Sequence, residues 1–162
     1  MYRCLVAGPF AVASGLLAGP PTQGDFMHVE HFSGCGGIRL KDMRVLVVED
    51  EPLVAMLVED ELLGAGARIV GPAYSVNDAL RLVEVAAADG GIDVAVLDIN
   101  LSGRHVSPVA QKLAALGVPS LFATGYSDDY DRGWYGAVPM LHKPFDSERL
   151  IAAVEALAPV AV

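Results

Sequence analysis

Five short aliphatic runs recur at steady spacing from residue 44 onward, and this repeat constrains the fold more than any other feature of the sequence. Their first residues lie 24, 26, 25 and 19 positions apart. Continuous runs rich in β-branched residues and bounded by turn residues are typical of strands buried on both faces of a parallel sheet. We therefore predict strands at Arg44–Val48, Arg68–Ala73, Val94–Asp98, Pro119–Ala123 and Val138–Leu141.

Apolar stripes at helical spacing follow the first, second, third and fifth of these runs. Pro52 is a favourable first residue for the first helix. Ser75 or Asn77 can cap the second helix, and Asp146 or Ser147 can cap the last. The stripes are Val54, Leu57, Val58 and Leu62; Val76, Leu80, Val83 and Ala87; Val109, Leu113 and Leu116; and Leu150, Val154 and Leu157. Strands and helices that alternate in this way predict an α/β fold, a doubly wound (βα)5 five-stranded parallel sheet with helices on both faces.

The connection between the fourth and fifth strands departs from the repeat. Residues 124–137 must supply a turn, a helix and a second turn, yet they show no apolar stripe at helical spacing. We predict that the fourth helix is short, frayed or missing, and that this segment is mobile unless something binds it.

The net charge lies entirely in the predicted domain. Residues 1–42 hold three basic and three acidic residues, whereas residues 43–162 hold eight basic and seventeen acidic residues, which accounts for the whole charge of −9. A nucleic-acid-binding surface needs clustered Lys and Arg, so this acidic balance argues against that class of function.

The first part of the chain is poor material for a fold. Its apolar run, Cys4–Gly19, is broken by glycine and proline, and 16 residues fall short of the roughly 20 that span a bilayer. Arg3 ahead of this run gives it some character of a secretory signal, but we do not expect export. We interpret residues 1–42 as a disordered N-terminal extension or as residues upstream of the true start, and residues 43–162 as the folded domain. The two cysteines form neither a disulfide scaffold nor a metal-binding pair.

Polar side chains stand at the carboxyl ends of four predicted strands. They are Glu49 and Asp50 after the first strand, Asp98 at the third, Thr124 after the fourth and Lys143 after the fifth. Because the carboxyl ends of parallel strands meet at one edge of a sheet, we expect these side chains to share a crevice. Carboxylates packed in this way repel by up to about 4 kcal/mol per pair, and a divalent cation relieves that repulsion. A site of hard oxygen ligands suits Mg²⁺, and Mn²⁺ is acceptable.

This arrangement suits phosphoryl transfer. A carboxylate beside a metal ion can attack a phosphoryl group and form an aspartyl-phosphate. The metal and a lysine then neutralise the charge on the phosphoryl oxygens, which is most of what such a transfer requires. A hydroxyl such as that of Thr124 can hydrogen-bond the product.

Four stretches of the sequence together resemble the receiver domain of bacterial response regulators. They are the run from Val45 to Pro52, the run from Val96 to Gly103, the Ala123-Thr-Gly stretch and the Lys143-Pro-Phe ending, and the resemblance covers residues 43 to about 158. It implies a flavodoxin-like fold for this part of the chain.

The resemblance also implies a role for each residue of the crevice. Asp98 is the implied phosphoacceptor, and Thr124 and Lys143 are implied to contact the phosphoryl group. The implied holders of Mg²⁺ are Glu49, Asp50, Asp98 and the backbone carbonyl of Asn100. The Lys143–Pro144 peptide bond is implied to be cis.

A narrower likeness is to the stand-alone receivers that carry a "FAT GUY" signature, and it rests on the run from Pro119 to Tyr126. Most receivers have an aromatic switch residue three positions before the lysine, whereas this chain has Met140 there. Aromatic residues gather instead in segment 125–137. We hypothesise that reorganisation of this segment replaces the aromatic switch as the output.

We interpret the chain as a single-domain receiver in a phosphorelay, phosphorylated in the cytoplasm by a sensor histidine kinase or a histidine phosphotransfer protein. Its expected output is contact with a downstream protein through residues 125–137 and the neighbouring surface, or service as a phosphate sink. We expect no output domain after Val162, no membrane contact and no enzyme activity beyond self-phosphorylation and slow autodephosphorylation.

An alternative from another class is a Mg²⁺-dependent phosphohydrolase or phosphotransferase of the haloacid-dehalogenase type, which also uses an aspartyl nucleophile. That family carries its nucleophile on the first strand, with an Asp two residues later. Here Asp98 lies on the third strand and has Asn100 at that offset. A nucleotide-binding Rossmann domain is disfavoured because no GxGxxG motif follows the first strand.

Overall fold

A computed structural model describes residues 39–125 and 138–158, and its main feature is a five-stranded parallel sheet. The strand order is β2-β1-β3-β6-β7, which is the order of the flavodoxin-like fold that the resemblance implied. A second, two-stranded antiparallel ribbon, β4–β5, follows β3. The strands are β1 (Arg44–Val48), β2 (Arg68–Ala73), β3 (Val94–Asp98), β4 (Asn100–Leu101), β5 (Arg104–His105), β6 (Ser120–Thr124) and β7 (Met140–His142).

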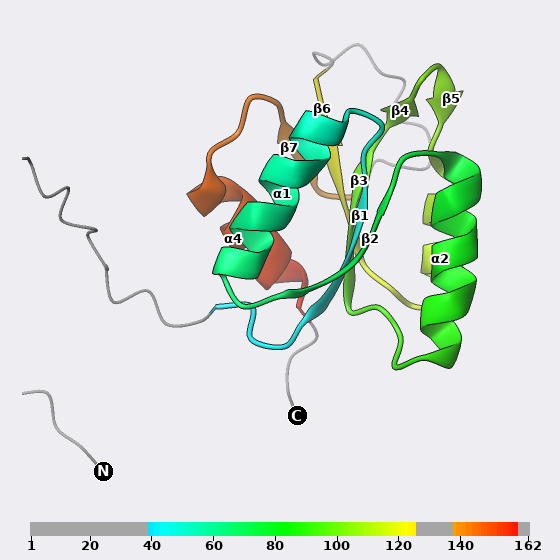
Figure 1. Ribbon diagram of the computed structural model, residues 1–162, viewed down its shortest axis with the longest axis horizontal. Coiled ribbons are helices and arrows are strands. Elements are labelled where there is room, and N and C mark those ends of the chain that lie inside the picture. Colours follow the sequence, from blue (N-terminus) through cyan, green and yellow to red (C-terminus); the bar gives the residue numbers. More distant parts are fainter. Residues whose placement is uncertain (1–38, 126–137, 159–162) are drawn as a thin grey trace, which may run out of the picture. The chain divides into compact units, whose positions relative to one another are not determined.

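Four helices in the described ranges cover the two faces of this sheet. They are α1 (Pro52–Gly64), α2 (Val76–Ala88), α3 (Ser107–Ala115) and α4 (Ser147–Leu157). Helices α1 and α4 lie together on one face, and α2 lies on the other (Figure 1). Helix α3 shares a hydrophobic cluster with α2, so the two pack on the same face. The predicted fold class is therefore confirmed.

Two of the predicted caps hold helix N-termini. The Ser75 hydroxyl accepts a hydrogen bond from the backbone N–H of Asp78 at the start of α2. At the start of α4, a carboxylate oxygen of Asp146 accepts from the backbone N–H of Arg149 at 2.8 Å. Each bond satisfies an amide that the helix itself leaves without a partner.

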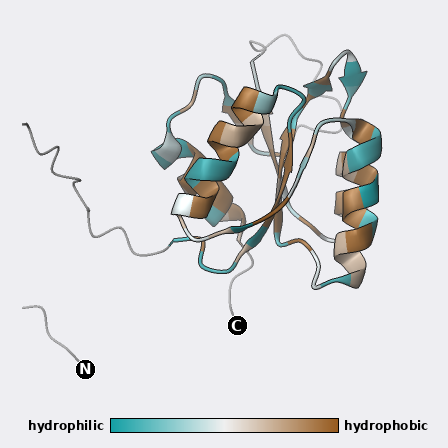
Figure 2. Cartoon of the chain, in the orientation of Figure 1, coloured by the Kyte–Doolittle hydropathy of each residue, from teal (hydrophilic) through white to brown (hydrophobic). Residues whose placement is uncertain are grey.

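Each face of the sheet has its own hydrophobic cluster. The cluster under α2 and α3 includes Leu97 and Phe122, which are completely buried. The cluster under α1 and α4 includes Val47 of the sheet and also Leu40, which is completely buried three residues before Met43. In Figure 2 the central strands are mostly brown, because alternate side chains of each strand enter the two clusters.

Three residues of the predicted helical stripes are exposed, so the stripes were wrong at those positions. Leu57 is 60% exposed and Leu116 is 48% exposed. Ala87 is also exposed, because Ala86 continues the buried stripe of α2. In α1 the buried residues are Ala55, Val58 and Leu62. Apolar residues occur on every side of this helix, among its three acidic residues, so its sequence pattern did not determine which side faces the sheet.

Some predictions concern residues that the structure does not describe. The prediction of a short or missing fourth helix falls on residues 126–137, and the predicted N-terminal extension falls almost entirely on residues 1–38. Within the described ranges, none of the helices is both long enough and apolar enough to cross a bilayer.

Gly71 of β2 has a backbone conformation that favours glycine, and a substitution can test it. Its φ is +122°, and a Cβ atom at this position would lie 3.0 Å from the Val47 carbonyl oxygen. Gly71→Ala is expected to lower the free energy of unfolding by roughly 1–3 kcal/mol, measured by urea denaturation. The control is Gly64→Ala at the end of α1, where nothing lies within 4 Å of the added carbon. It is expected to be neutral or to stabilise by up to about 1 kcal/mol. Equal effects of the two substitutions would contradict the strain at Gly71.

Candidate functional site

Three carboxylates converge at the carboxyl edge of the sheet. Glu49 and Asp50 directly follow β1, and Asp98 is the last residue of β3. Because β1 and β3 are adjacent parallel strands with Val48 opposite Leu97, their ends bring these side chains together. One oxygen from each carboxylate lies within 4.8 Å of the other two. The sequence-based expectation that these three acids share a crevice is thus met.

Lys143 enters the same crevice from the end of β7. Its Nζ donates hydrogen bonds to Glu49 Oε2 at 2.5 Å and to Asp98 Oδ2 at 2.6 Å. The backbone of Lys143 is fixed in turn, because its N–H donates to the carbonyl oxygen of Thr124 at 2.8 Å. The Lys143–Pro144 peptide bond that follows is cis, as the resemblance implied.

Burial shapes the electrostatics of this cluster. Glu49 is 3% exposed, and the loss of water around it raises the pKa of its carboxyl. The hydrogen bond and charge of Lys143 oppose that rise, while the nearby charge of Asp98 adds to it. For Lys143, burial by itself lowers the pKa, but the hydrogen bonds and charges of Asp98 and Glu49 outweigh it and raise the pKa. The ammonium therefore stays charged and holds two carboxylates that would otherwise repel each other.

The β4–β5 ribbon restrains two further carboxylate oxygens. The backbone N–H of Asn100 donates to Asp98 Oδ1 at 3.0 Å, and the Ser102 hydroxyl donates to Asp50 Oδ2 at 2.6 Å. The Asn100 side chain accepts a bond from the Gly103 N–H at 2.8 Å. The sequence pointed to Asn100 for its carbonyl, whereas Ser102 was missed. A Ser-Gly pair shortly after a strand end marks a turn, and this signal could have indicated the turn but not the bond of Ser102 to Asp50.

A shallow opening of about 230 Å³ leads from these groups to the surface. Its lining consists of Asp50, Glu51, Asp98, Asn100, Ser102, Gly103, Gly125 and Lys143. Thr124 is the last residue of β6 and is 1% exposed, and it does not line this opening, whereas the next residue, Gly125, does.

The donor set fits a divalent cation. Three carboxylates and one ammonium leave two negative charges (−3 + 1 = −2) on Glu49, Asp50, Asp98 and Lys143. Hard oxygen donors around an opening that admits water are the environment in which Mg²⁺ retains part of its hydration shell. The acidic cluster can therefore bind a divalent metal.

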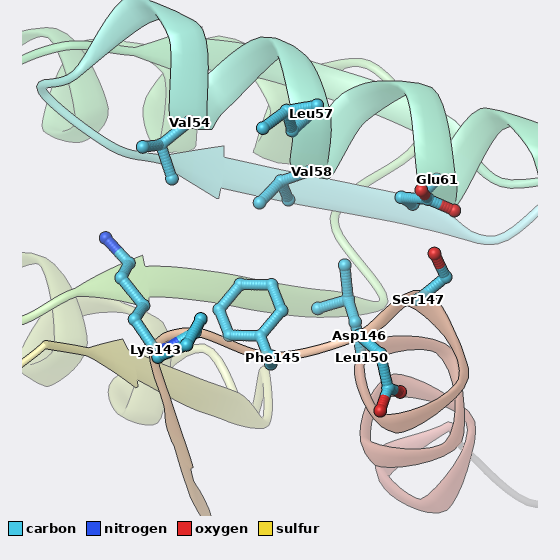
Figure 3. A pocket seen from close by; sticks show the side chains of 10 residues that line it. Val54, Leu57, Val58, Glu61, Lys143, Phe145, Asp146, Ser147 and Leu150 are labelled. Carbon is cyan, nitrogen blue, oxygen red and sulfur yellow. The ribbon is translucent and has the colours of Figure 1, made fainter.

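An apolar groove of about 570 Å³ adjoins the site. Figure 3 shows Val54 and Leu57 of α1 on one side, with Phe145 and Leu150 on the other. Lys143 lines both this groove and the opening above the carboxylates, so the two hollows share a wall.

Comparison with known proteins gives a consistent result. The family model described as "Response regulator receiver domain" matches residues 45–155. The transcriptional regulatory protein CutR of Streptomyces coelicolor is 38% identical over 122 residues, which cover 71% of this chain and 53% of CutR. The chain spans about half the length of the curated relatives it matches.

Solved structures agree with the family match. The solution structure of SdrG from Sphingomonas melonis is 42% identical, with a TM-score of 0.57, and the match covers 72% of this chain and 96% of SdrG. A crystal structure of a variant of the anti-anti-sigma factor PhyR from Bartonella quintana is 25% identical, with a TM-score of 0.60. That match covers 74% of this chain and 50% of the PhyR chain.

The bridging role of Lys143 can be tested without any phosphodonor. Lys143→Gln leaves Glu49 and Asp98 facing each other, so without metal the free energy of unfolding should fall by about 3 kcal/mol. Mg²⁺ should recover part of that loss, because the cation can replace the missing positive charge. Urea denaturation with Mg²⁺ and with a chelator measures both quantities.

The matched control is Lys112→Gln on α3, whose ammonium lies 3.9 Å from Glu84 in an exposed ion pair. Its effect should stay below about 0.5 kcal/mol and should not depend on Mg²⁺. Equal losses in the two variants would argue against the bridge.

Proposed function

The chain belongs to the response regulator receiver domain family of two-component systems, and we propose that it accepts a phosphoryl group on Asp98. The proposed donors are a sensor histidine kinase or a histidine phosphotransfer protein. The observation that carries the proposal is the setting of Asp98, which lines the opening, accepts a hydrogen bond from the Lys143 ammonium and lies close to two further carboxylates.

The geometry suits a carboxylate nucleophile. Asp98 Oδ1 is held by the Asn100 N–H and Oδ2 by Lys143, so the carboxylate has a fixed orientation toward the opening. In the proposed step, one carboxylate oxygen bonds to phosphorus while the bond between phosphorus and the donor nitrogen breaks. Lys143 then exchanges its bond to the free carboxylate for one to a phosphoryl oxygen.

Mg²⁺ is the proposed cofactor, with Mn²⁺ as a substitute. Glu49, Asp50, Asp98 and the backbone carbonyl of Asn100 would hold it, and the bound ion would neutralise charge on the phosphoryl oxygens. Thr124 is the proposed hydroxyl contact of the phosphoryl group. It lies at the end of β6, directly before Gly125 in the wall of the opening.

The proposed output is contact with another protein or service as a phosphate sink in the cytoplasm, without further enzyme activity. The acidic net charge supports a protein partner over nucleic acid. The hypothesis that segment 125–137 carries the output falls outside the described residues except for Gly125. The haloacid-dehalogenase alternative is less favoured, because that family places its aspartyl nucleophile at the end of the first strand, where this chain has Glu49 directly after β1, and Asp98 ends the third strand of the sheet, β3.

We assign the apolar groove between α1 and the segment from Lys143 to Leu150 to the phosphodonor protein. A phosphohistidine can reach Asp98 only if its protein covers the opening, and the groove shares Lys143 with that opening. Helix α1 has three acidic residues and no basic one, and Glu61 and Asp146 line the groove. These charges favour a donor surface with apolar residues flanked by Lys or Arg, and they disfavour a second copy of this acidic face.

Asp98→Asn tests the phosphoacceptor. The substitution should abolish labelling by acetyl phosphate and by a cognate kinase while the fold survives, because the amide is a far weaker nucleophile. The control is Asp89→Asn at the exposed end of α2, which should be labelled like the wild type. Stoichiometric labelling of the Asp98→Asn variant, measured by intact mass, would place the nucleophile elsewhere.

Leu57→Ser tests the groove. The rate of phosphotransfer from the kinase should fall about tenfold, since a buried anchor of an interface is worth more than 1 kcal/mol. Labelling by acetyl phosphate should not change, because so small a donor needs no groove. The matched control is Leu116→Ser, an exposed leucine that precedes β6 at the opposite edge of the sheet. A parallel loss with acetyl phosphate, or an equal effect of Leu116→Ser, would contradict this assignment.

A further inference from the structure

The turn between β4 and β5 places a serine where the backbone does not favour one. Ser102 and Gly103 are the two loop residues of this hairpin, and their φ angles are +51° and +83°. A two-residue turn with positive φ at both positions favours Asn, Asp or Gly at the first. Serine in the left-handed region costs conformational energy, so the turn itself provides no reason for this side chain.

The Ser102 side chain does have a partner across the site. Its hydroxyl donates to Asp50 Oδ2 at 2.6 Å, which joins residues 52 positions apart in sequence. Glu49 and Asp98 both accept from Lys143. In the described part of the chain, the hydrogen bond that holds the Asp50 carboxylate comes from Ser102 instead. Each of the three carboxylates therefore has a restraint, and that of Asp50 is a single hydroxyl.

The hydrogen bond from Ser102 to Asp50 is present while the three carboxylates of the site lie close together. With Ser102 bonded to Oδ2, an oxygen of Asp50 still lies within 4.8 Å of oxygens of Glu49 and Asp98. Asp50 lies at the surface opening, where its carboxylate could turn toward water and away from two like charges. A hydrogen bond from a neutral hydroxyl opposes that rotation and leaves the remaining lone pairs available to a cation.

We propose that Ser102 is a positioning residue that holds Asp50 in the orientation in which it receives a divalent cation. The proposal rests on the proposed function, because that function supplies the need for the cation. Hydrogen bonds to a metal-binding carboxylate fix its orientation, and their removal commonly lowers metal affinity by about 10–100-fold. Because Asp50 is partly exposed, the loss should lie near the lower limit, at about tenfold.

The same hairpin also restrains Asp98. The Asn100 N–H donates to Asp98, and the Asn100 side chain accepts from the Gly103 N–H inside the turn. The conformation of one turn thus sets the orientation of two of the three carboxylates. Of its two loop residues, Ser102 is the one whose side chain contacts the site.

The test is a calorimetric titration of the unphosphorylated, full-length chain with Mg²⁺, combined with its melting temperature in a chelator. Ser102→Gly removes the hydroxyl and relieves the positive φ, so it should raise the metal-free melting temperature and weaken Mg²⁺ binding about tenfold. Ser102→Ala should weaken binding equally without the gain in stability. Ser120→Ala, at the opposite edge of the sheet, should bind Mg²⁺ like the wild type.

A serine with only a structural role would not give a variant that melts at a higher temperature and yet binds Mg²⁺ more weakly. If the wild type binds Mg²⁺ and Ser102→Gly binds it within twofold, the role of Ser102 is overturned and the proposed function stands. If the wild type binds no Mg²⁺, the metal site of the proposed function fails, and the role of Ser102 fails with it.

Discussion

Repulsion among three carboxylates at one edge of the sheet is the constraint on which the rest of this structure depends. Glu49 and Asp98 meet because β1 and β3 are adjacent and parallel, and Lys143 reaches both because β7 ends at the same edge. Glu49 is 3% exposed, so its charge must be balanced by an ammonium or a cation. The fold brings the carboxylates together and also places beside them the Lys143 ammonium, which reduces their repulsion.

Most of the fold could be predicted from the sequence, because strands buried on both faces require unbroken apolar runs. The five predicted runs correspond to five strands, with ends displaced by at most two residues. The same pattern predicted that the polar residues at the carboxyl ends of these parallel strands would lie together at one edge of the sheet. The structure brings together Glu49, Asp50, Asp98 and Lys143. Their roles in phosphoryl transfer remain predictions.

The features that could not be predicted depend on tertiary contacts, which the spacing of apolar residues along the sequence does not encode. Apolar residues occur on every side of α1, so its sequence carries no signal for its orientation and Leu57 was wrongly placed inward. The bond from Ser102 to Asp50 depends on a turn that brings two distant segments together. Met140, at the position where most receivers have an aromatic residue, begins β7 opposite Phe122 and packs on the core beneath α2 and α3. Its partial burial gives it a packing role that the sequence comparison did not reveal.

The brevity of β7 has a mechanical consequence. This strand has three residues and pairs with β6 on one side, and the N–H of Lys143 continues that pairing to Thr124. Any force on the ammonium therefore acts on an edge strand, which has fewer backbone hydrogen bonds to resist a shift than the central strands have. The two bonds of Lys143 thus join the ends of two central strands, each paired on both sides, to the margin of the sheet.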